Sequence, residues 1–341
     1  MTPKFALIVC TYMRPGPLAQ LLESVRAQRS YPDQIVIIDG SRDQLTGKML
    51  QQQHFANLEY YLVSDADRGL TRQRNFGIRK LASDIEIVCF LDDDIVLEPG
   101  YFENLLQTYN LFPEALGVGG YILDEAQWIP AGGDEPTAID FFVFDGWKRP
   151  EPLRFRLRRR FGLDSDVAPG FSPEFSHGRS IGFLPPSGKI YPVNQLMGGV
   201  SSFRKSVFDQ FSFSTFFEGY GLYEDADFTL RVSKAGPLYV NTAAWLRHYH
   251  DPLGRPNQFR YGKMVVRNGF YVWRVAHGSP SFKSRLKWHA ITLLLTGIRL
   301  ANAVTGPARF QALTETAGRF SGWASVLIDP PYPKQEAPPS T

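Results

Sequence analysis

Cysteine is nearly absent from this sequence. The two cysteines, Cys10 and Cys89, lie in the apolar segments FALIVC and IEIVCF, where they resemble small buried hydrophobic residues. Cysteines placed in this way provide neither a disulfide framework nor the paired spacing of a zinc site. We therefore expect a protein of a reducing compartment, and we predict a cytoplasmic location.

Long hydrophobic runs are also missing. The most apolar stretch beyond the amino-terminal region, AITLLLTGI from Ala290, ends after nine residues at Arg299. A membrane-spanning helix needs about 20 apolar residues. The amino-terminal segment FALIVC is too short for the apolar part of a secretory signal. We therefore expect neither a transmembrane helix nor a cleaved leader.

Charge of one sign is scarce in the chain as a whole. The 37 Lys and Arg residues and 34 Asp and Glu residues leave a net charge of +3, which argues against a protein that coats nucleic acid. The charge is unevenly distributed, because residues 253–341 contain 12 basic and 3 acidic side chains, a balance of +9. The preceding residues carry the opposite balance, −6. A basic carboxyl-terminal region suits an anionic surface or ligand.

Three common phosphate-binding motifs do not occur. The chain has no GxxxxGK[ST] sequence, and the turn after its first predicted strand reads CTYMRPGP rather than GxGxxG. A DxDxT motif is not matched either, because Val96 follows Asp92 and Asp94 where threonine is required. These absences argue against P-loop, dinucleotide-binding and haloacid-dehalogenase-type chemistry.

The first 120 residues instead alternate between two kinds of segment. Short β-rich runs are separated by stretches with helical character, a pattern typical of βαβ units with a mostly parallel sheet. The predicted strands are residues 5–10, 34–39, 58–63, 85–92 and 116–122. The predicted helices are residues 17–28, 44–54, 70–81 and 99–109. The fold class is therefore α/β, a Rossmann-like sheet flanked by helices.

The rest of the chain suggests a domain plan. A catalytic domain at residues 1–252 would comprise a nucleotide-binding half (1–122), a long insertion (about 128–191) and an acceptor-side half (192–252). The insertion contains the basic sequence KRPEPLRFRLRRR and, we expect, only short elements. Residues 253–328 form a basic helical appendage with predicted helices at 257–277, 282–304 and 307–327. The Pro-rich tail, residues 329–341, is predicted to be disordered.

Polar residues follow several predicted strands. Thr11, Asp39 and Asp92 each lie at or just past the carboxyl end of one. In open α/β sheets, ligands bind in the crevice outside those ends. The sequence therefore predicts a site at this edge of the sheet.

The motif FLDDDIVLEP is the strongest single signal of chemistry. Asp92, Asp93 and Asp94 repel one another unless a cation compensates, and carboxylates at a strand end suit Mg²⁺ or Mn²⁺ bound to phosphate oxygens. The alternative is a solvated turn in which one aspartate caps the next helix.

Two further motifs lie downstream. YEDADF places Glu224, Asp225 and Asp227 at the start of a predicted helix, where acids also complement the helix dipole and where a carboxylate could act as a general base. LRHYHD places His248 and His250 on one face of a strand, a hint of metal ligands.

The segment RGLTRQRNFGI places arginines at the start of a predicted helix. Arg72 and Arg74 could hold a diphosphate there. An exposed basic face explains the same residues equally well.

These motifs together resemble those of a family 2 glycosyltransferase of the GT-A fold, in the same order over roughly residues 4–277. The resemblance is carried by CTYMRP, IIDGS, RGLTRQRNFGI, FLDDDIVLEPGYFE, MGGVSSFRKSVF, YEDADFTLRVSKAG and VRNGFYVWRVAHG. It implies a GT-A catalytic domain, here with a carboxyl-terminal helical appendage. It also implies a metal-dependent, inverting enzyme of the kind that builds bacterial polysaccharides.

The resemblance also implies roles for individual residues. Asp225 would be the catalytic base, and Asp94 the direct metal ligand with His248 or His250 as a further contact. The donor nucleotide sugar would be bound by Thr11, Arg14, Asp39, Arg74, Asp92 and Asp93. Residues on the acceptor side would be Gly198, Gly199, Glu224 and Asp227.

The expected reaction moves a sugar from a UDP-, GDP- or dTDP-sugar to a hydroxyl of a glycan or lipid-linked acceptor, with Mg²⁺ or Mn²⁺ as cofactor. Polysaccharide or glycolipid assembly is the expected setting. A metal-dependent nucleotidyl- or phosphotransferase could use the same carboxylates and is the first alternative. A non-catalytic carbohydrate- or nucleic-acid-binding protein is the second, but binding alone does not need clustered carboxylates. We predict no nucleic-acid partner.

A peripheral membrane location is also predicted. Lys283, Arg285 and Lys287 precede an apolar stretch that contains Trp288 and residues 293–295. A basic, Trp-bearing segment too short to span a bilayer is typical of helices in the interface of an anionic membrane, here the inner face of the cell membrane. The alternative is that these helices pack on the catalytic domain and expose a solvated basic face.

Overall fold

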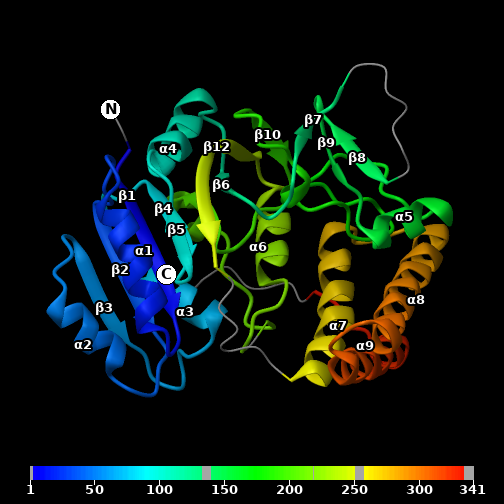
Figure 1. The fold of residues 1–341 in the computed structure, drawn as a ribbon. Helices are drawn as coiled ribbons and strands as arrows, with labels where there is room; N and C mark the ends of the chain where they lie inside the picture. Colours follow the sequence, from blue (N-terminus) through cyan, green and yellow to red (C-terminus); the bar gives the residue numbers. More distant parts are fainter. Residues whose placement is uncertain (1–2, 133–139, 218, 250–256, 334–341) are drawn as a thin grey trace. The chain divides into compact units, whose positions relative to one another are not determined.

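The computed structural model describes residues 3–132, 140–217, 219–249 and 257–333 (Figure 1). The chain divides into two compact units, each built from segments distant in sequence. The first contains residues 1–125 and 186–254, and the second contains residues 126–185 and 255–336.

A mixed sheet forms the centre of the first unit (Figure 1). Its strand order is β10-β12-β6-β11-β4-β1-β2-β3, and β5 pairs with β12. Six of these strands run in one direction, whereas β5, β10 and β11 run in the other. The strands are β1 (Phe5–Thr11), β2 (Gln34–Asp39), β3 (Leu58–Leu62), β4 (Ile87–Asp92), β5 (Ile95–Leu97), β6 (Gly117–Ile122), β10 (Ile190–Val193), β11 (Val200–Arg204) and β12 (Leu238–His248). The predicted mostly parallel sheet is confirmed.

Helices cover the sheet because its central strands are apolar on both faces. On one face, Leu7 and Val9 of β1 share a core with residues of α1 (Pro15–Arg26) and α4 (Tyr101–Leu111). The opposite face contacts α3 (Leu70–Ile78) and α6 (Glu224–Val232). The helix α2 (Leu45–Gln52) follows β2.

Phenylalanines account for much of the packing beneath α6. Phe228 of α6 stacks on Phe213, with ring centroids 4.2 Å apart, and meets Phe203 of β11 edge-on at 5.1 Å. Phe90 of β4 joins the same cluster through Phe203 and Phe213. Aromatic contacts of this kind add to the stabilisation from apolar burial. They fix the start of α6 against the end of β4, the two elements that carry the acidic motifs.

Three helices dominate the second unit: α7 (Gln258–Ala276), α8 (Phe282–Thr305) and α9 (Arg309–Ile328). Trp273 of α7 stacks on Trp288 of α8 with ring centroids 5.5 Å apart, in a core that also contains Val326 of α9. Trp288 is therefore buried. The prediction that its ring lies in a membrane interface is wrong, because the stacking partner is inside the protein.

The insertion packs with these helices. The Trp273 indole donates a hydrogen bond to the Glu174 carbonyl oxygen (2.8 Å), and the Glu174 carboxylate accepts one from the Ser281 backbone N–H (2.9 Å). Its regular elements include the three-stranded sheet of β7 (Ile129–Pro130), β9 (Trp147–Pro150) and β8 (Phe141–Phe144), the helix α5 (Leu153–Arg160) and a short 3-10 helix (Ile181–Phe183). The compact units thus differ from the predicted domains, which placed this insertion in the catalytic domain.

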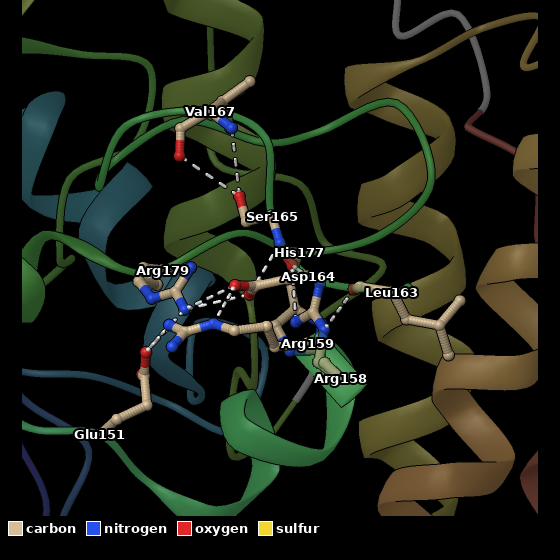
Figure 2. A network of polar contacts seen from close by, with 9 residues as sticks. All are labelled: Glu151, Arg158, Arg159, Leu163, Asp164, Ser165, Val167, His177 and Arg179. Atoms are coloured by element: carbon tan, nitrogen blue, oxygen red, sulfur yellow. Dashed lines mark hydrogen bonds and ion pairs between the residues drawn. The ribbon is translucent and has the colours of Figure 1, made fainter. Parts of the chain in front are cut away.

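The RLRRR part of the basic cluster lies in α5, and two of its arginines, Arg158 and Arg159, have partners within the protein (Figure 2). Arg158 is fully buried and donates to the carbonyl oxygens of Leu163 and His177. Arg159 and Arg179 both bind the buried Glu151 carboxylate, at 2.7 and 2.9 Å. Arg158 and Arg159 are therefore held by partners inside the protein rather than free to bind a distant ligand.

The end of the chain is described as far as residue 333. Tyr332 lies in the predicted disordered tail and meets the Phe270 ring edge-on, with centroids 6.0 Å apart. Residues 334–341 of that tail lie outside the described residues. Within the described parts of the chain, no helix combines the length and apolar character needed to cross a bilayer.

Candidate active site

The acidic motifs and Thr11 meet at the carboxyl edge of the sheet. The register of β1 pairs Thr11 with Asp39 of β2, and Cys10 with Asp92 of β4, so the three strands end together. After β4 the chain turns through Asp93 and Asp94 into β5. Parallel neighbours that end at one level bring side chains from distant parts of the sequence together.

Asp93 faces the first strand and its loop. Its carboxylate accepts hydrogen bonds from the Thr11 hydroxyl (2.6 Å) and from the Arg14 guanidinium (3.0 Å). Burial raises the pKa of Asp93 to about 6, against the opposing effects of Thr11 and Arg14. The same arginine lies 3.5 Å from Asp94. Thr11, Arg14 and Asp93 thus form one hydrogen-bonded group, in which Thr11 and Asp93 are buried and Arg14 is partly exposed.

Asp92, Asp94 and His248 form the candidate metal centre. One ligand atom from each lies within 4.8 Å of the others, and His248 Nε2 is 3.0 Å from Asp94 Oδ1. The antiparallel pairing of β12 with β5 holds the histidine there, with His248 opposite Ile95. Burial lowers the pKa of His248, but the hydrogen bond to Asp94 and the charges of Asp94 and Asp92 outweigh it and raise the pKa above its usual value. His250 lies outside the described residues.

A buried arginine connects α3 with the second acidic motif. Arg74 forms an ion pair with Glu224 and lies 3.8 Å from Asp92. The guanidinium also lies over the Phe213 ring, 5.1 Å from its centroid. Arg74 is 3% exposed, so it does not belong to an exposed basic face, whereas Arg72 is only partly buried.

The pKa of Glu224 is strongly perturbed. Burial raises its pKa to about 8, although the neighbouring Arg74 opposes this shift. One carboxylate oxygen binds Arg74, while the other, Oε2, is buried without a hydrogen-bond partner. A buried polar atom without a partner is costly, and such atoms occur often at functional sites.

Asp225 is half-buried at the start of α6. The backbone N–H of Gly198 donates to its Oδ2 (3.1 Å), and the N–H of Ala226 donates to its Oδ1 (2.8 Å). These two bonds orient the carboxylate. Its remaining lone pairs can accept a proton, as a general base must.

Two predicted site residues are engaged in structural contacts. Asp227 is fully buried and binds the Arg231 guanidinium one turn along α6 (2.7 Å), which fits a role in holding the helix better than one in contacting an acceptor. Asp39 is also fully buried, and its two oxygens accept from the Ser41 N–H and the Tyr60 hydroxyl, both at 2.8 Å.

Gly198 and Gly199 allow the two acidic motifs to approach each other. A Cβ atom on Gly199 would lie 2.0 Å from Asp92 Cγ, and one on Gly198 would lie 2.6 Å from Glu224 Oε1. No real Cβ contact is so short, so any side chain here must displace a carboxylate.

Replacing Gly199 with alanine should therefore disturb the metal centre. We expect destabilisation by about 1–3 kcal/mol from overpacking. We also expect weaker Mn²⁺-dependent donor binding, because Asp92 must move away from Asp94 and His248. Thermal unfolding and calorimetric titration measure the two effects. Gly297→Ala in α8 is the matched control, because its Cβ would meet nothing within 4 Å.

Gln73 was missed by the sequence analysis although it shapes the site. Its amide is buried in α3 and donates to the carbonyl oxygens of Thr11 (3.2 Å) and Ile38 (2.8 Å), which clamps the ends of β1 and β2. A glutamine in a polar helical stretch is usually exposed. The burial of Gln73 becomes evident only when the ends of β1 and β2 are known to lie beside α3.

Comparison with solved structures identifies the class of fold. A mannosyltransferase from Pyrobaculum calidifontis, solved with GDP-Man and Mn²⁺, aligns over 96% of this chain and 88% of its own, with a TM-score of 0.54 and 15% identity. GalNAc-T7, solved with UDP, GalNAc and Mn²⁺, aligns over 84% of this chain and 53% of its own, with a TM-score of 0.50 and 14% identity. At such low identity the likeness concerns the fold, which is the GT-A fold with added carboxyl-terminal helices.

Comparison of sequences relates the first half of the chain to a known family. The family described as glycosyl transferase family 2 matches residues 6–165. A glucosyl-dolichyl phosphate glucuronosyltransferase of Haloferax volcanii is 29% identical over 131 residues, which cover 37% of this chain and 40% of that protein. The putative glycosyltransferase EpsH of Bacillus subtilis is 31% identical over 108 residues, which cover 31% of this chain and 30% of that protein. Residues 6–165 therefore match the family that the motifs predicted. The matches to these curated relatives extend over less than half of their length.

Proposed function

We propose that this protein transfers a sugar, with inversion, from a nucleotide-diphosphate sugar to an acceptor hydroxyl. The observation that carries the proposal is the approach of the Asp92–Asp94–His248 group to the start of α6. Gly199 lies against Asp92, and the backbone N–H of the adjacent Gly198 donates to Asp225. A single displacement at an anomeric carbon requires two groups: a centre that stabilises the charge on the leaving group, and an oriented carboxylate that takes the proton of the acceptor hydroxyl.

The residues of the metal centre fit Mg²⁺ or Mn²⁺. Two carboxylates and one imidazole supply hard oxygen and nitrogen ligands and leave positions for phosphate oxygens. When bound, such an ion would neutralise the charge that develops on the diphosphate leaving group. Asp94, which is 7% exposed, and His248 are the proposed direct ligands, with Asp92 positioned to contact both ion and donor.

The donor would occupy the edge formed by β1, β2 and β4. Thr11, Arg14 and Asp93 are one hydrogen-bonded group there, and Arg74 places a positive charge next to Asp92. Relatives of this fold were solved with UDP and with GDP-Man, and we propose a UDP-, GDP- or dTDP-sugar as donor for this chain.

Asp225 is proposed as the general base. It is less buried than Glu224, whose carboxylate is committed to Arg74. As the acceptor hydroxyl attacks the anomeric carbon, Asp225 takes its proton, and the bond to the diphosphate oxygen breaks. One base and one displacement invert the anomeric centre, whereas a retaining double displacement would need a carboxylate nucleophile.

For the acceptor we propose a glycan or a lipid-linked saccharide, in polysaccharide or glycolipid assembly at the inner face of the cell membrane. The name of the Haloferax relative specifies a lipid-linked substrate, and this supports the proposal. The basic carboxyl-terminal region supports it independently, because lipid-linked acceptors lie at a membrane surface.

A thermal-shift screen of sugar nucleotides with and without Mn²⁺ tests the function. Ligands that bind the native state stabilise it by mass action, and saturation at 100 times Kd gives about 2.7 kcal/mol. We expect one sugar nucleotide to raise Tm in Mn²⁺ and much less in EDTA. Stabilisation by nucleoside triphosphates alone, with release of pyrophosphate in an assay, would indicate a nucleotidyltransferase instead.

A further inference from the structure

The helix α8 presents an apolar stripe to solvent. Its members recur at intervals of three or four residues and therefore share one face of the helix. Val304 and Phe282, at the two ends, are 71% and 75% exposed. The large side chains of the stripe are Phe282, Leu286, Leu293, Leu300 and Val304, and the intervening positions Ala290, Gly297 and Ala301 carry no charge.

The helix α9 has a second stripe of the same kind. Phe310 and Ile328, near its two ends, are 80% and 85% exposed. Its large side chains are Phe310, Leu313, Phe320, Leu327 and Ile328, and the small residues Ala317 and Ala324 lie between them. We call the two stripes together the outer apolar face.

Both stripes lie on the sides of their helices that face away from one shared core. Trp288 of α8 and Val326 of α9 are buried in one cluster, and both lie opposite the stripe of their own helix. Trp323 of α9 donates a hydrogen bond to His289 of α8 (3.1 Å), which holds the helices side by side (Figure 1). Two neighbouring helices that bury one side in common expose the other side in common. Apolar surface of this extent on one side of a protein marks a site of interaction.

The charges of α8 and α9 are almost all positive. Between residues 282 and 328 there are six Lys and Arg residues and one acid, Glu315. Glu315 is buried and paired with Arg299 and Arg319, both at 2.7 Å, so its charge is compensated inside the protein. Lys283, Arg285 and Arg309 are exposed beside the stripes.

We propose that the outer apolar face binds an anionic lipid bilayer, with α8 and α9 lying in the plane of the interface. Apolar side chains would enter the acyl boundary, while the exposed Lys and Arg residues contact anionic headgroups. The charge argues against a second copy of this chain as the occupant. Two copies of the face would bring the same positive charges together with no exposed acid on either helix to balance them.

This surface differs from the predicted one. The sequence pointed to Trp288 and its basic neighbours, whereas the structure buries Trp288 and places Lys287 over the Phe175 ring at 4.3 Å. The outer apolar face supplies the apolar contact instead. As a location for catalysis, the proposal rests on the proposed lipid-linked acceptor, but lipid binding itself is measurable without any substrate.

Vesicle flotation of the full chain tests the proposal. The probes are vesicles of phosphatidylcholine alone and of phosphatidylcholine mixed with phosphatidylglycerol. We expect flotation with the mixed vesicles at low salt, and a partition coefficient at least tenfold lower for the variant Leu313→Ser, Phe320→Ser. Lys283→Glu with Arg285→Glu should also weaken binding, mainly at low salt, because salt screens the electrostatic part.

The controls keep the outcome decisive. Leu45→Ser and Leu111→Ser remove leucines that are equally exposed in the first unit, and these variants should float as the wild type does. Circular dichroism establishes that each variant is folded. Wild type that stays with the soluble fraction at low salt overturns the proposal. The proposal is also overturned if light scattering shows the wild type as a dimer and the Leu313→Ser, Phe320→Ser variant as a monomer, while neither protein binds vesicles. Donor-induced stabilisation in the thermal-shift assay reports on the enzyme separately, so either proposal can fail alone.

Discussion

Asp225→Asn should lower turnover at least about 100-fold, since general-base catalysis contributes roughly 10²–10⁴-fold. The substitution keeps the shape of the side chain, and the amide oxygen of asparagine can still accept from the Gly198 N–H, as Oδ2 does now at 3.1 Å. The lost property is the capacity to take a proton. Donor affinity in Mn²⁺, measured by calorimetry, should change little because this carboxylate faces the acceptor in the proposed reaction.

Two neighbouring acids provide matched controls for that experiment. Asp227→Asn removes the partner of Arg231, so it should lower the melting temperature more than it lowers turnover. Glu224→Gln removes the partner of Arg74 and should weaken donor binding. If Asp225→Asn retained turnover within tenfold of wild type, the role of base would move to Glu224 or Asp227.

Much of the first unit could be predicted because its signals are local. Runs such as FALIVC and QIVIID are apolar at every position, as strands buried on both faces must be, and they became β1 and β2 at nearly the predicted bounds. The alternation of such runs with helical segments selects a parallel sheet, and a parallel sheet brings its carboxyl ends to one edge. The gathering of Thr11, Asp39 and Asp92 followed from this logic.

Contacts between distant parts of the chain could not be predicted in the same way. The Arg74–Glu224 pair joins residues 150 positions apart, and neither local sequence identifies its partner. An exposed basic face was one interpretation of Arg74, and its burial beside Phe90 and Phe213 argues against that interpretation. Local pattern indicates that a charge is present, whereas packing determines whether that charge meets solvent.

In the second unit, composition suggested exposed side chains that the packing buries. A run such as RLRRR suggests a solvated basic patch. Arg158, however, is fully buried and donates to backbone carbonyl oxygens, and Arg159 is bound to Glu151 (Figure 2). Trp288 beside lysines suggests an interface, but its ring stacks on Trp273. The exposed stripes of α8 and α9 were overlooked because an apolar stripe predicts burial unless the packing is known.

Asp94→Ala should abolish the metal-dependent part of donor binding and, with it, transfer. Asp94 offers a ligand atom near those of Asp92 and His248, and it accepts from His248 at 3.0 Å. Without this carboxylate the centre keeps one acid and an imidazole whose orienting partner is gone. Calorimetric titration of the variant with a sugar nucleotide should give the same weak affinity in Mn²⁺ as in EDTA, whereas the wild type should bind more tightly in Mn²⁺.

The fold should tolerate this change, which makes the result interpretable. Asp94 adds to the repulsion among three adjacent carboxylates, and Arg14 keeps its bond to Asp93 when Asp94 is removed. We therefore expect the metal-free melting temperature of Asp94→Ala to equal or exceed that of the wild type. Asp124→Ala, which removes an exposed carboxylate paired with Arg247, serves as control and should retain the Mn²⁺ dependence. Transfer by the wild type in EDTA at its full rate would contradict the metal assignment, because the charge on the leaving group would then be stabilised by Arg14 and Arg74 alone.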